Sequence, residues 1–231
     1  MGGAAYVRQP SASDTRQSLR AEAKRCFLLE SGMPDSKSRA KKIKLLLFDV
    51  DGVLTDGKLF FLPTTRQDNR GPAGGLNLTS QGSIEVKGFH AHDGIAISLA
   101  RVAGIKTGLI TKRTSETVAV RGRDLRLNHI RQGIQDKVAA FREILAQEKL
   151  TAAEACFVGD DVIDLPVMWN CGLAIAVANA RDEVKKAAHY VTKRCGGEGA
   201  LRDAIEFILK SQGRLNKIVT EYIGASDLGG Q

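Results

Sequence analysis

The sequence predicts an α/β fold built on a doubly wound, mostly parallel sheet with helices on both faces. Apolar runs of strand length recur along the chain and alternate with segments of helical periodicity. Continuous apolar strands that alternate with helices are typical of parallel sheets buried on both sides. The chain has 231 residues, of which 43% are hydrophobic, and this suits one domain with appendages.

The strands and helices follow one another in an order that fits this fold. The predicted strands are the apolar runs 43–48, 106–110, 156–158 and 173–177. The predicted helices, with apolar residues at helical spacing, are 94–102, 115–123, 136–147, 162–169, 181–188 and 200–210. The 25 residues between Thr111 and Lys137 have room for the helix 115–123 and for one strand after it.

One segment interrupts the alternation and predicts a β-hairpin insertion at about 57–89. Residues 58–62 and 83–89 have the pattern of two hairpin arms, and the stretch between them is rich in Gly, Pro and Asn. This composition predicts a long hairpin tip. Neither this insertion nor the stretch between Thr111 and Lys137 is long enough for an independent cap domain, so we expect none.

The two ends of the chain differ in composition from its middle. Residues 1–40 are polar and weakly periodic, and they predict a basic, partly disordered leader with a short helix around 15–30. The segment 41–212 holds the predicted α/β domain. The segment 213–231 becomes polar and Gly-rich and predicts a flexible tail.

The formal net charge of +8 is concentrated in the leader. Residues 1–44 hold ten Lys or Arg against four Asp or Glu, whereas the other 187 residues carry a surplus of only two. A solvated basic terminus explains this clustering, and weak contact with RNA or another anionic surface is the alternative. Only 5% of the residues are aromatic and they do not alternate with basic residues, so we expect no nucleic-acid partner.

Membrane segments and disulfides are not expected either. The sequence contains no run of about 18 apolar residues that could span a bilayer, and its first residues lack the apolar core of a signal peptide. The four cysteines form no C-x-x-C pair, which predicts reduced thiols without zinc. These observations predict a cytoplasmic protein with no membrane partner.

Polar side chains follow the predicted strands at the points where the strands end. The first strand, in "LLLFDVDGVLTDG", is followed by Asp49 and Asp51. The later positions of this kind are, in chain order, Thr111, Lys137, Asp160, Asp161 and Asp164. Because ligands of open parallel sheets bind at the carboxyl ends of the strands, we expect these side chains to meet. Gathered carboxylates would raise each other's pKa unless a cation lay among them, and oxygen ligands suit Mg²⁺.

The spacing of the first two aspartates predicts phosphoryl chemistry. On an extended strand, residues two apart point the same way, so Asp49 and Asp51 can flank one phosphoryl group. Asp49 can attack phosphorus and form an aspartyl-phosphate, and Asp51 can protonate the leaving alkoxide and then activate water. Lys137 and Mg²⁺ would offset the negative charge between carboxylate and phosphate, and Thr111 can donate a hydrogen bond to a phosphoryl oxygen.

Taken in order, these residues resemble the four motifs of the haloacid dehalogenase superfamily of phosphatases. D-V-D-G is the first motif, Thr111 the second, Lys137 the third and G-D-D-V-I-D the fourth. The resemblance implies a Rossmann-like fold of the haloacid dehalogenase type, with Asp49 and Asp160 as side-chain ligands of Mg²⁺ and Asp51 as a ligand through its backbone carbonyl. The resemblance implies that Asp164 contacts these ligands without binding the metal itself.

The role of one further aspartate in the fourth motif stays open at this point. Asp161 is either a carboxylate that assists the metal site or simply the N-cap of the helix that follows, and the sequence favours neither.

A narrower resemblance covers about residues 42–215. The segments "FHAHDGIAISLARVAGIKTGLITKR", "QGIQDK", "FVGDDVIDLPVM" and "GGEGALRD" resemble the capless 3-deoxy-D-manno-octulosonate 8-phosphate phosphatases, a family of lipopolysaccharide biosynthesis. The resemblance implies Mg²⁺-dependent hydrolysis of this sugar-acid phosphate to the free acid. It also implies a homotetramer with hairpins lining its centre, in which the segment of Gly196 and Gly197 approaches a neighbouring subunit's site.

Departures from the family pattern bear on the substrate. The second motif usually has the pattern T-G-R, and here Lys112 stands in place of Gly, before Arg113. Lys112 either adds a cation near the substrate or points to solvent. His92 stands where the family usually has Arg, and His cannot copy the two hydrogen bonds by which Arg grips a carboxylate. Lys112, Arg113, His92, Gly196 and Gly197 are therefore candidate substrate contacts whose partner the sequence does not fix.

Other functions remain open on the sequence alone. The substrate alternative is a nine-carbon acylneuraminate or KDN 9-phosphate, and a non-catalytic assembly domain of a sugar-acid activating system is a third possibility. A receiver-like signalling module also uses carboxylates, Thr and Lys around Mg²⁺, but it carries its phosphorylated Asp after a middle strand and lacks a second aspartate such as Asp51. The position of D-V-D-G on the first strand therefore favours the phosphatase.

Overall fold

The computed structural model describes residues 35–63 and 83–227. They belong to one compact unit that begins at Asp35. The helix expected around 15–30 and the tip expected between the two hairpin arms lie outside the described residues. Within them, no helix is long and apolar enough to cross a membrane.

The centre of the unit is a parallel sheet of six strands, in the order β5-β4-β1-β6-β7-β8. In chain order the strands are β1 (Leu45–Phe48), β4 (Lys106–Ile110), β5 (His129–Arg131), β6 (Ala155–Gly159), β7 (Leu173–Ala176) and β8 (Tyr190–Val191). All neighbouring pairs are parallel. The predicted doubly wound sheet is confirmed, with β8 as an edge strand that the sequence analysis did not predict.

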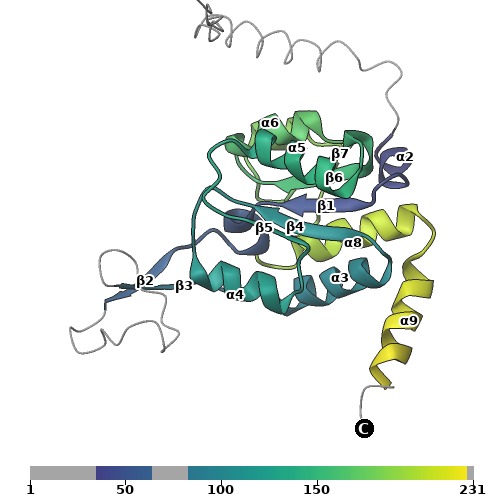
Figure 1. Ribbon diagram of the computed structural model, residues 1–231, viewed down its shortest axis with the longest axis horizontal. Coiled ribbons are helices and arrows are strands. Elements are labelled where there is room, and N and C mark those ends of the chain that lie inside the picture. Colours follow the sequence, from purple (N-terminus) through teal and green to yellow (C-terminus); the bar gives the residue numbers. More distant parts are fainter. Residues whose placement is uncertain (1–34, 64–82, 228–231) are drawn as a thin grey trace, which may run out of the picture. The chain divides into compact units, whose positions relative to one another are not determined.

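Helices cover both faces of the sheet, as Figure 1 shows, with α5 and α6 on one face and α3, α4 and α8 on the other. The bounds are α3 (Ala91–Val102), α4 (Glu116–Asp124), α5 (Lys137–Glu148), α6 (Leu165–Asn170), α7 (Asp182–Ala187) and α8 (Ala200–Ser211). The helix predicted at 162–169 is divided into a short turn η4 (Val162–Asp164) and α6. Pro166 lies in the first turn of α6, where its missing amide hydrogen costs no helical hydrogen bond. A further short turn, η3 (Ala152–Glu154), precedes β6.

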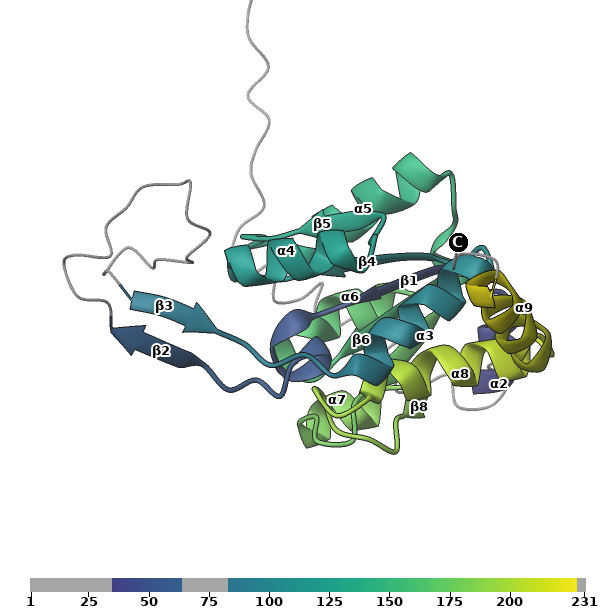
Figure 2. The same cartoon turned by 90° about the horizontal axis from the view of Figure 1, so that it is seen from below.

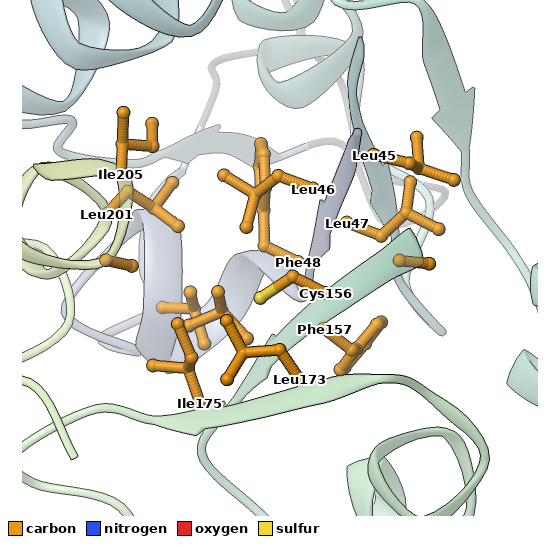
Figure 3. Close-up of a cluster of buried hydrophobic side chains, with 14 of the residues drawn as sticks. Leu45, Leu46, Leu47, Phe48, Cys156, Phe157, Leu173, Ile175, Leu201 and Ile205 are labelled. Carbon is orange, nitrogen blue, oxygen red and sulfur yellow. The ribbon is translucent and has the colours of Figure 1, made fainter. Parts of the chain in front are cut away.

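The core is densest around β1, whose four residues are all fully buried. Figure 3 shows their side chains packed with Cys156 and Phe157 of β6, and with Leu201 and Ile205 of α8. Burial on both faces explains why β1 has no alternation of polar and apolar residues. Phe48 pairs with Leu109 of β4 and with Val158 of β6, so the three strands end level with one another.

The predicted hairpin insertion is present and extends away from the sheet (Figure 2). Its strands β2 (Phe60–Pro63) and β3 (Ser83–Val86) pair in antiparallel register, with Phe60 opposite Val86. An irregular turn η1 (Val50–Leu54) connects β1 toward the hairpin. Several large apolar side chains of the hairpin are exposed, namely Leu59, Phe60, Phe61, Leu62 and Val86.

The compact unit begins inside the segment predicted as a leader. Helix α2 (Ser36–Ala40) is capped by Asp35, whose carboxylate accepts a hydrogen bond from the backbone N–H of Ser38 at 2.6 Å. Ala40 is fully buried, and α2 packs against α8. The compact unit therefore begins at Asp35, because a short capped helix docks within the last residues of the predicted leader.

The segment predicted as a flexible tail, 213–231, contains helix α9 (Leu215–Asp227). One face of this helix packs on the core through Leu215, Ile218, Val219 and Tyr222, at the spacing of successive helical turns. Helix α9 contacts both α3 and α8. The prediction of a flexible tail rested on the polar and Gly-rich composition of the whole segment, and four apolar residues were too few to indicate a helix.

The packing of α9 can be tested with two isoleucines in the same helix. Ile218 is 2% exposed and Ile223 is 56% exposed. Ile218→Ala removes buried methyl groups and should lower the free energy of unfolding by about 2 to 4 kcal/mol. Ile223→Ala is the matched control and should change it by less than about 0.5 kcal/mol. Urea unfolding measures both, and equal small effects would mean that α9 is not docked in solution.

Candidate active site

Asp49 stands at the carboxyl end of β1, and it is 4% exposed. Its Oδ1 accepts a hydrogen bond from the backbone N–H of Val50 at 2.7 Å, and its Oδ2 lies 2.6 Å from Nζ of Lys137. A buried carboxylate is tolerated when it is paired and hydrogen-bonded in this way. The strand therefore ends in an anionic group whose two oxygens are both held in place.

Lys137 is the first residue of α5 and its ammonium bridges two carboxylates. Asp136 caps this helix by accepting hydrogen bonds from the backbone N–H groups of Val138 and Ala139 at 2.9 and 3.0 Å. Nζ of Lys137 lies 2.6 Å from Oδ2 of Asp49 and 2.8 Å from Oδ1 of Asp164. Burial by itself lowers the pKa of Lys137, but the charges of Asp164 and Asp49 outweigh burial and raise it. The lysine therefore stays charged.

Three carboxylates meet at this edge of the sheet. Asp49, Asp160 and Asp164 each place one oxygen within 4.8 Å of the others. Burial, followed by the charges of Asp164 and Asp49, raises the pKa of Asp160 to about 7. Burial and the charge of Asp164 also raise the pKa of Asp49 to about 6, against the opposing effect of Lys137. One ammonium thus compensates the three carboxylates only in part.

The donor set fits a hard divalent cation. All three side chains offer oxygen, and Oδ1 of Asp160 is buried without a hydrogen-bond partner. Both oxygens of Asp164 are engaged, Oδ1 by Lys137 and Oδ2 by the backbone N–H of Asp160 at 3.0 Å. Asp49 and Asp160 are therefore the side chains of the cluster that could ligate a metal directly, and Asp164 orients its two neighbours.

Gly52 makes the approach of Asp160 possible. A Cβ at position 52 would lie 2.1 Å from Oδ2 of Asp160, and the backbone there has φ of +93°, a conformation that side chains rarely adopt. The glycine of D-V-D-G is thus required by both the turn and the adjacent carboxylate.

Asp51 is close in sequence to Asp49 but has different partners. Its Oδ1 contacts Nζ of Lys87, and its Oδ2 lies 3.4 Å from Nε of Arg113. The spacing of the two aspartates predicted an extended chain through both, but η1 begins at Val50, where the chain turns. Asp51 therefore lies outside the cluster of three carboxylates.

Two residues of this part of the site were missed by the sequence analysis. Glu85 lies in β3 and Lys87 just after it, and both are buried. Oε1 of Glu85 lies 3.5 Å from Nζ of Lys87 and 2.7 Å from Nη2 of Arg113. Burial by itself raises the pKa of Glu85, but hydrogen bonds and the two neighbouring cations outweigh it and lower the pKa. Charged residues in a hairpin arm are normally solvated, so their type alone gave no signal.

The second-motif residues lie where the sequence analysis placed them, at the end of β4. Thr111 is buried, and its backbone N–H donates to the carbonyl of Arg131 at 2.9 Å. Lys112 is exposed and, among the residues that the structure describes, has no ion pair with a carboxylate. It lines a cavity of about 270 Å³ together with Gln135, Asp136, Lys137, Val138, Ile163 and Pro166.

Gly196 and Gly197 lie against the backbone of the first motif. A Cβ at Gly196 would lie 1.7 Å from the carbonyl oxygen of Gly52, and the backbone N–H of Gly197 donates to the carbonyl of Val53 at 3.1 Å. The backbone N–H of Gly196 also donates to Oδ1 of Asn179 at 2.9 Å, so the two glycines connect the loop that carries Asp51 to the segment after β7. They support that loop by close backbone packing.

Two other candidates have contacts that are explained by helix capping. Oδ1 of Asp161 accepts a hydrogen bond from the backbone N–H of Val162 at 2.7 Å, as the N-cap of η4. His92 is exposed in the first turn of α3, and its backbone N–H donates to Nδ1 of His90 at 3.1 Å. Neither side chain belongs to the carboxylate cluster.

Comparison with known proteins agrees with this geometry. The model of the haloacid dehalogenase-like hydrolase family matches residues 110–201. The chain is 35% identical to the 3-deoxy-D-manno-octulosonate 8-phosphate phosphatase KdsC of Escherichia coli over 183 residues, which make up 79% of this chain and 88% of that protein.

Two solved structures share the fold. A probable YrbI family phosphatase from Pseudomonas syringae matches with a TM-score of 0.71 and 38% identity over 82% of this chain and 97% of that one. The 3-deoxy-D-manno-octulosonate 8-phosphate phosphatase from Moraxella catarrhalis, in complex with magnesium ion, phosphate ion and KDO, matches with a TM-score of 0.70 and 30% identity over 81% of this chain and 97% of that one. The chain therefore belongs to the haloacid dehalogenase superfamily and is a phosphatase related to the KdsC enzymes.

Proposed function

We propose that this phosphatase hydrolyses 3-deoxy-D-manno-octulosonate 8-phosphate to the free sugar acid and phosphate, with Mg²⁺ as its cofactor. The observation that carries the proposal is the cluster of Asp49, Asp160 and Asp164 around Lys137, with a separately held Asp51 beside it. The E. coli relative that carries this activity in its name matches over most of both chains. We further infer a cytoplasmic enzyme, and the described cysteines, all free thiols, are compatible with that compartment.

In the first half of the proposed reaction, an oxygen of Asp49 forms a bond to phosphorus while the bond from phosphorus to the sugar oxygen breaks. The carboxylic acid of Asp51 gives its proton to the departing alkoxide, so that a neutral hydroxyl leaves. The product is an aspartyl-phosphate on Asp49. Lys137 keeps Asp49 in place through the contact at 2.6 Å.

In the second half, Asp51 takes a proton from water, whose oxygen attacks phosphorus. The bond from phosphorus to Asp49 breaks, inorganic phosphate leaves, and the free carboxylate returns. The same residue thus acts first as acid and then as base. Bound Mg²⁺ would be held by Asp49, Asp160 and the backbone carbonyl of Asp51, and it would neutralise charge on the phosphoryl oxygens.

The other predicted site residues contact the substrate in this proposal or support the loop of the first motif. Thr111, buried at the end of β4, donates to a phosphoryl oxygen in this proposal. Lys112 and Arg113, both exposed, are the cations that follow it. Lys112 suits the carboxylate of a sugar acid, and Arg113, which already pairs with Asp51 and Glu85, would reach the substrate through its remaining nitrogen. His92, at the start of α3, contacts the far end of the sugar. Gly196 and Gly197 act indirectly, by supporting the loop of the first motif.

The nucleophile is tested by Asp49→Asn. Because the amide cannot form the acyl-phosphate, phosphate release from 3-deoxy-D-manno-octulosonate 8-phosphate should fall by about 10³-fold or more. EDTA should abolish the wild-type rate, and Mg²⁺ should restore it. The matched control is Asp182→Asn, an exposed aspartate in the first turn of α7, which should keep wild-type activity.

The same assay decides the substrate when nine-carbon acylneuraminate and KDN 9-phosphates are included. A higher kcat/KM for either would reject the eight-carbon substrate. Equal rates for the wild type and Asp49→Asn would reject the proposed nucleophile.

The metal ligands are tested through Gly52. Gly52→Ala places a Cβ within 2.1 Å of Asp160 and should displace this carboxylate. The Mg²⁺ concentration for half-maximal activity should rise by about 10- to 100-fold. Gly57→Ala is the matched control, since φ there is also positive at +79°, but the nearest atom to its Cβ is the backbone nitrogen of Gly52 at 3.4 Å. Calorimetric titration with Mg²⁺ supplies a second readout, and an equal shift in both variants would contradict the role of Asp160.

We also propose that the chain forms a homotetramer through its hairpin. Phe60 and Leu62 are 53% and 54% exposed, and Phe61, on the opposite side of the strand, is 48% exposed. Exposed apolar side chains gathered on both sides of a two-stranded hairpin are typical of an interaction surface. An antiparallel pair of this length is also marginal by itself and would be stabilised by association.

Light scattering coupled to size exclusion tests this assembly. The wild type should have about four times the 24.9 kDa mass of one chain. Phe60→Glu would bury a charge in the interface and should give a smaller species. Val120→Glu, at an exposed apolar position of α4, is the control that should keep the wild-type mass. A monomeric wild type at assay concentration would overturn the proposal.

A further inference from the structure

Lys87 is an unusual residue for a hairpin arm because its side chain is 0% exposed. Its ammonium contacts Oδ1 of Asp51 and lies 3.5 Å from Oε1 of Glu85. Removing a lysine charge from water is costly unless carboxylates compensate it. Lys87 is thus a buried cation whose nearest partner is the residue assigned to proton transfer.

Arg113 approaches the same carboxylate from the other side. Its Nε lies 3.4 Å from Oδ2 of Asp51, and its Nη2 lies 2.7 Å from Oε1 of Glu85. Each oxygen of Asp51 therefore faces one cation, and Glu85 connects the two cations. These four residues come from three segments, which are the η1 turn, the β3 arm and the end of β4.

In the β3 arm the usual burial pattern of a hairpin is reversed, because its charged side chains are buried and its apolar side chain is exposed. Glu85 and Lys87 are two residues apart, point to the same side and are buried, whereas Val86 between them is 41% exposed. Charged side chains face inward and an apolar one faces outward. Thr117 of α4 donates from Oγ1 to the carbonyl of Glu85 at 3.3 Å, and this contact fixes the arm against the domain.

Asp51 depends on such outside contacts for its orientation. It lies in the irregular turn η1, next to Gly52 with its positive φ, and its side chain is 20% exposed. Asp49, in contrast, is held by Lys137 and by the backbone N–H of Val50. The hydrogen bonds and ion pairs found for the carboxylate of Asp51 are those to Lys87 and Arg113.

We propose that Lys87 is a positioning residue, which together with Arg113 holds the carboxyl group of Asp51 toward the leaving group. The inference deepens the proposed function and rests on it. The hairpin arm then has a part in the chemistry of its own subunit. Asp51 still transfers the proton, from its carboxyl oxygen to the sugar alkoxide, and Lys87 neither gives nor takes one.

Two substrates with different leaving groups distinguish a positioning role of Lys87 from a role in the stability of the fold alone. A sugar alkoxide is a poor leaving group and needs the proton from Asp51, whereas p-nitrophenolate leaves without one. Lys87→Met keeps an unbranched side chain that is one atom shorter and removes its charge. Because Asp51 also activates water in the second half for either substrate, the comparison is made in kcat/KM, which reports formation of the aspartyl-phosphate. We expect kcat/KM for the sugar phosphate to fall by about 10²-fold or more, while kcat/KM for p-nitrophenyl phosphate falls less than about 10-fold.

Two further variants complete the kinetic test. Lys87→Arg should recover part of the loss on the sugar phosphate, because it restores a cation beside Asp51. Lys58→Met is the matched control, since Lys58 also precedes a hairpin strand but its side chain is 71% exposed and pairs with Asp56. This control should keep the wild-type kinetics and melting temperature.

A double mutant shows whether Lys87 acts through Asp51. If it does, adding Lys87→Met to Asp51→Asn should cost little further kcat on the sugar phosphate. Equal losses of kcat/KM on both leaving groups, or full additivity in the double mutant, would overturn the positioning role and leave a structural one.

A crystal structure of Lys87→Met gives a readout that is independent of the substrate. The carboxylate of Asp51 should be rotated or present in several conformers, and an unchanged Asp51 would overturn the inference. A different result would contradict the proposed function, namely a wild type that hydrolyses p-nitrophenyl phosphate but not 3-deoxy-D-manno-octulosonate 8-phosphate. In that case the Asp51 conformation and the leaving-group series, repeated with simple alkyl phosphates, still decide the role of Lys87.

Discussion

The site depends on one ion-pair network, in which the ammonium of Lys137 lies between Asp49 and Asp164. Both carboxylates and the lysine are buried, so each would be strongly unfavourable without the others. The network also reaches Asp160, because Asp164 accepts a hydrogen bond from the backbone N–H of that residue. One lysine at the first turn of a helix thereby fixes Asp49, the proposed nucleophile, and through Asp164 it fixes the backbone that carries Asp160, the second metal-ligand candidate.

The parallel sheet creates the setting for this network. Strands β1, β4 and β6 end in register, so the residues that follow them arrive at one edge without further adjustment. The apolar residues of these strands are buried in the core. The polar residue that follows each strand is therefore the earliest position that can contact solvent or a ligand. The three carboxylates gathered there are only partly compensated by Lys137, and this residual negative charge suits a divalent cation, which the proposed phosphate substrate would in turn require.

Sequence reasoning recovered the parts of the site that follow from strand ends and failed where the backbone departs from regular geometry. Asp49, Lys137 and Asp160 were predicted to meet because parallel strands have a common carboxyl edge. The spacing argument for Asp51 assumed an extended chain, whereas the chain turns at Val50 and the Asp51 side chain pairs with Lys87 and Arg113. Its place beside the phosphoryl group stays a proposal. This turn packs closely against the loop of Gly196, a tertiary contact that no local pattern reveals.

The missed elements have similar physical reasons. Helix α9 depends on a stripe of four apolar residues that is stabilised only once α3 and α8 are present. Lys87 and Glu85 have the composition of a solvated arm, and only their burial beside Asp51 distinguishes them. Tertiary context, not propensity, decided each of these positions.

The contact of Gly196 and Gly197 with the first-motif loop has a consequence for biosynthesis. The loop at residues 50–56 leaves the ribosome early, but the segment that braces it is made about 140 residues later and lies just before α8. The neighbours of β1, strands β4 and β6, are also made later. Asp49 and Asp51 therefore cannot reach their final arrangement until almost the whole domain has been synthesised.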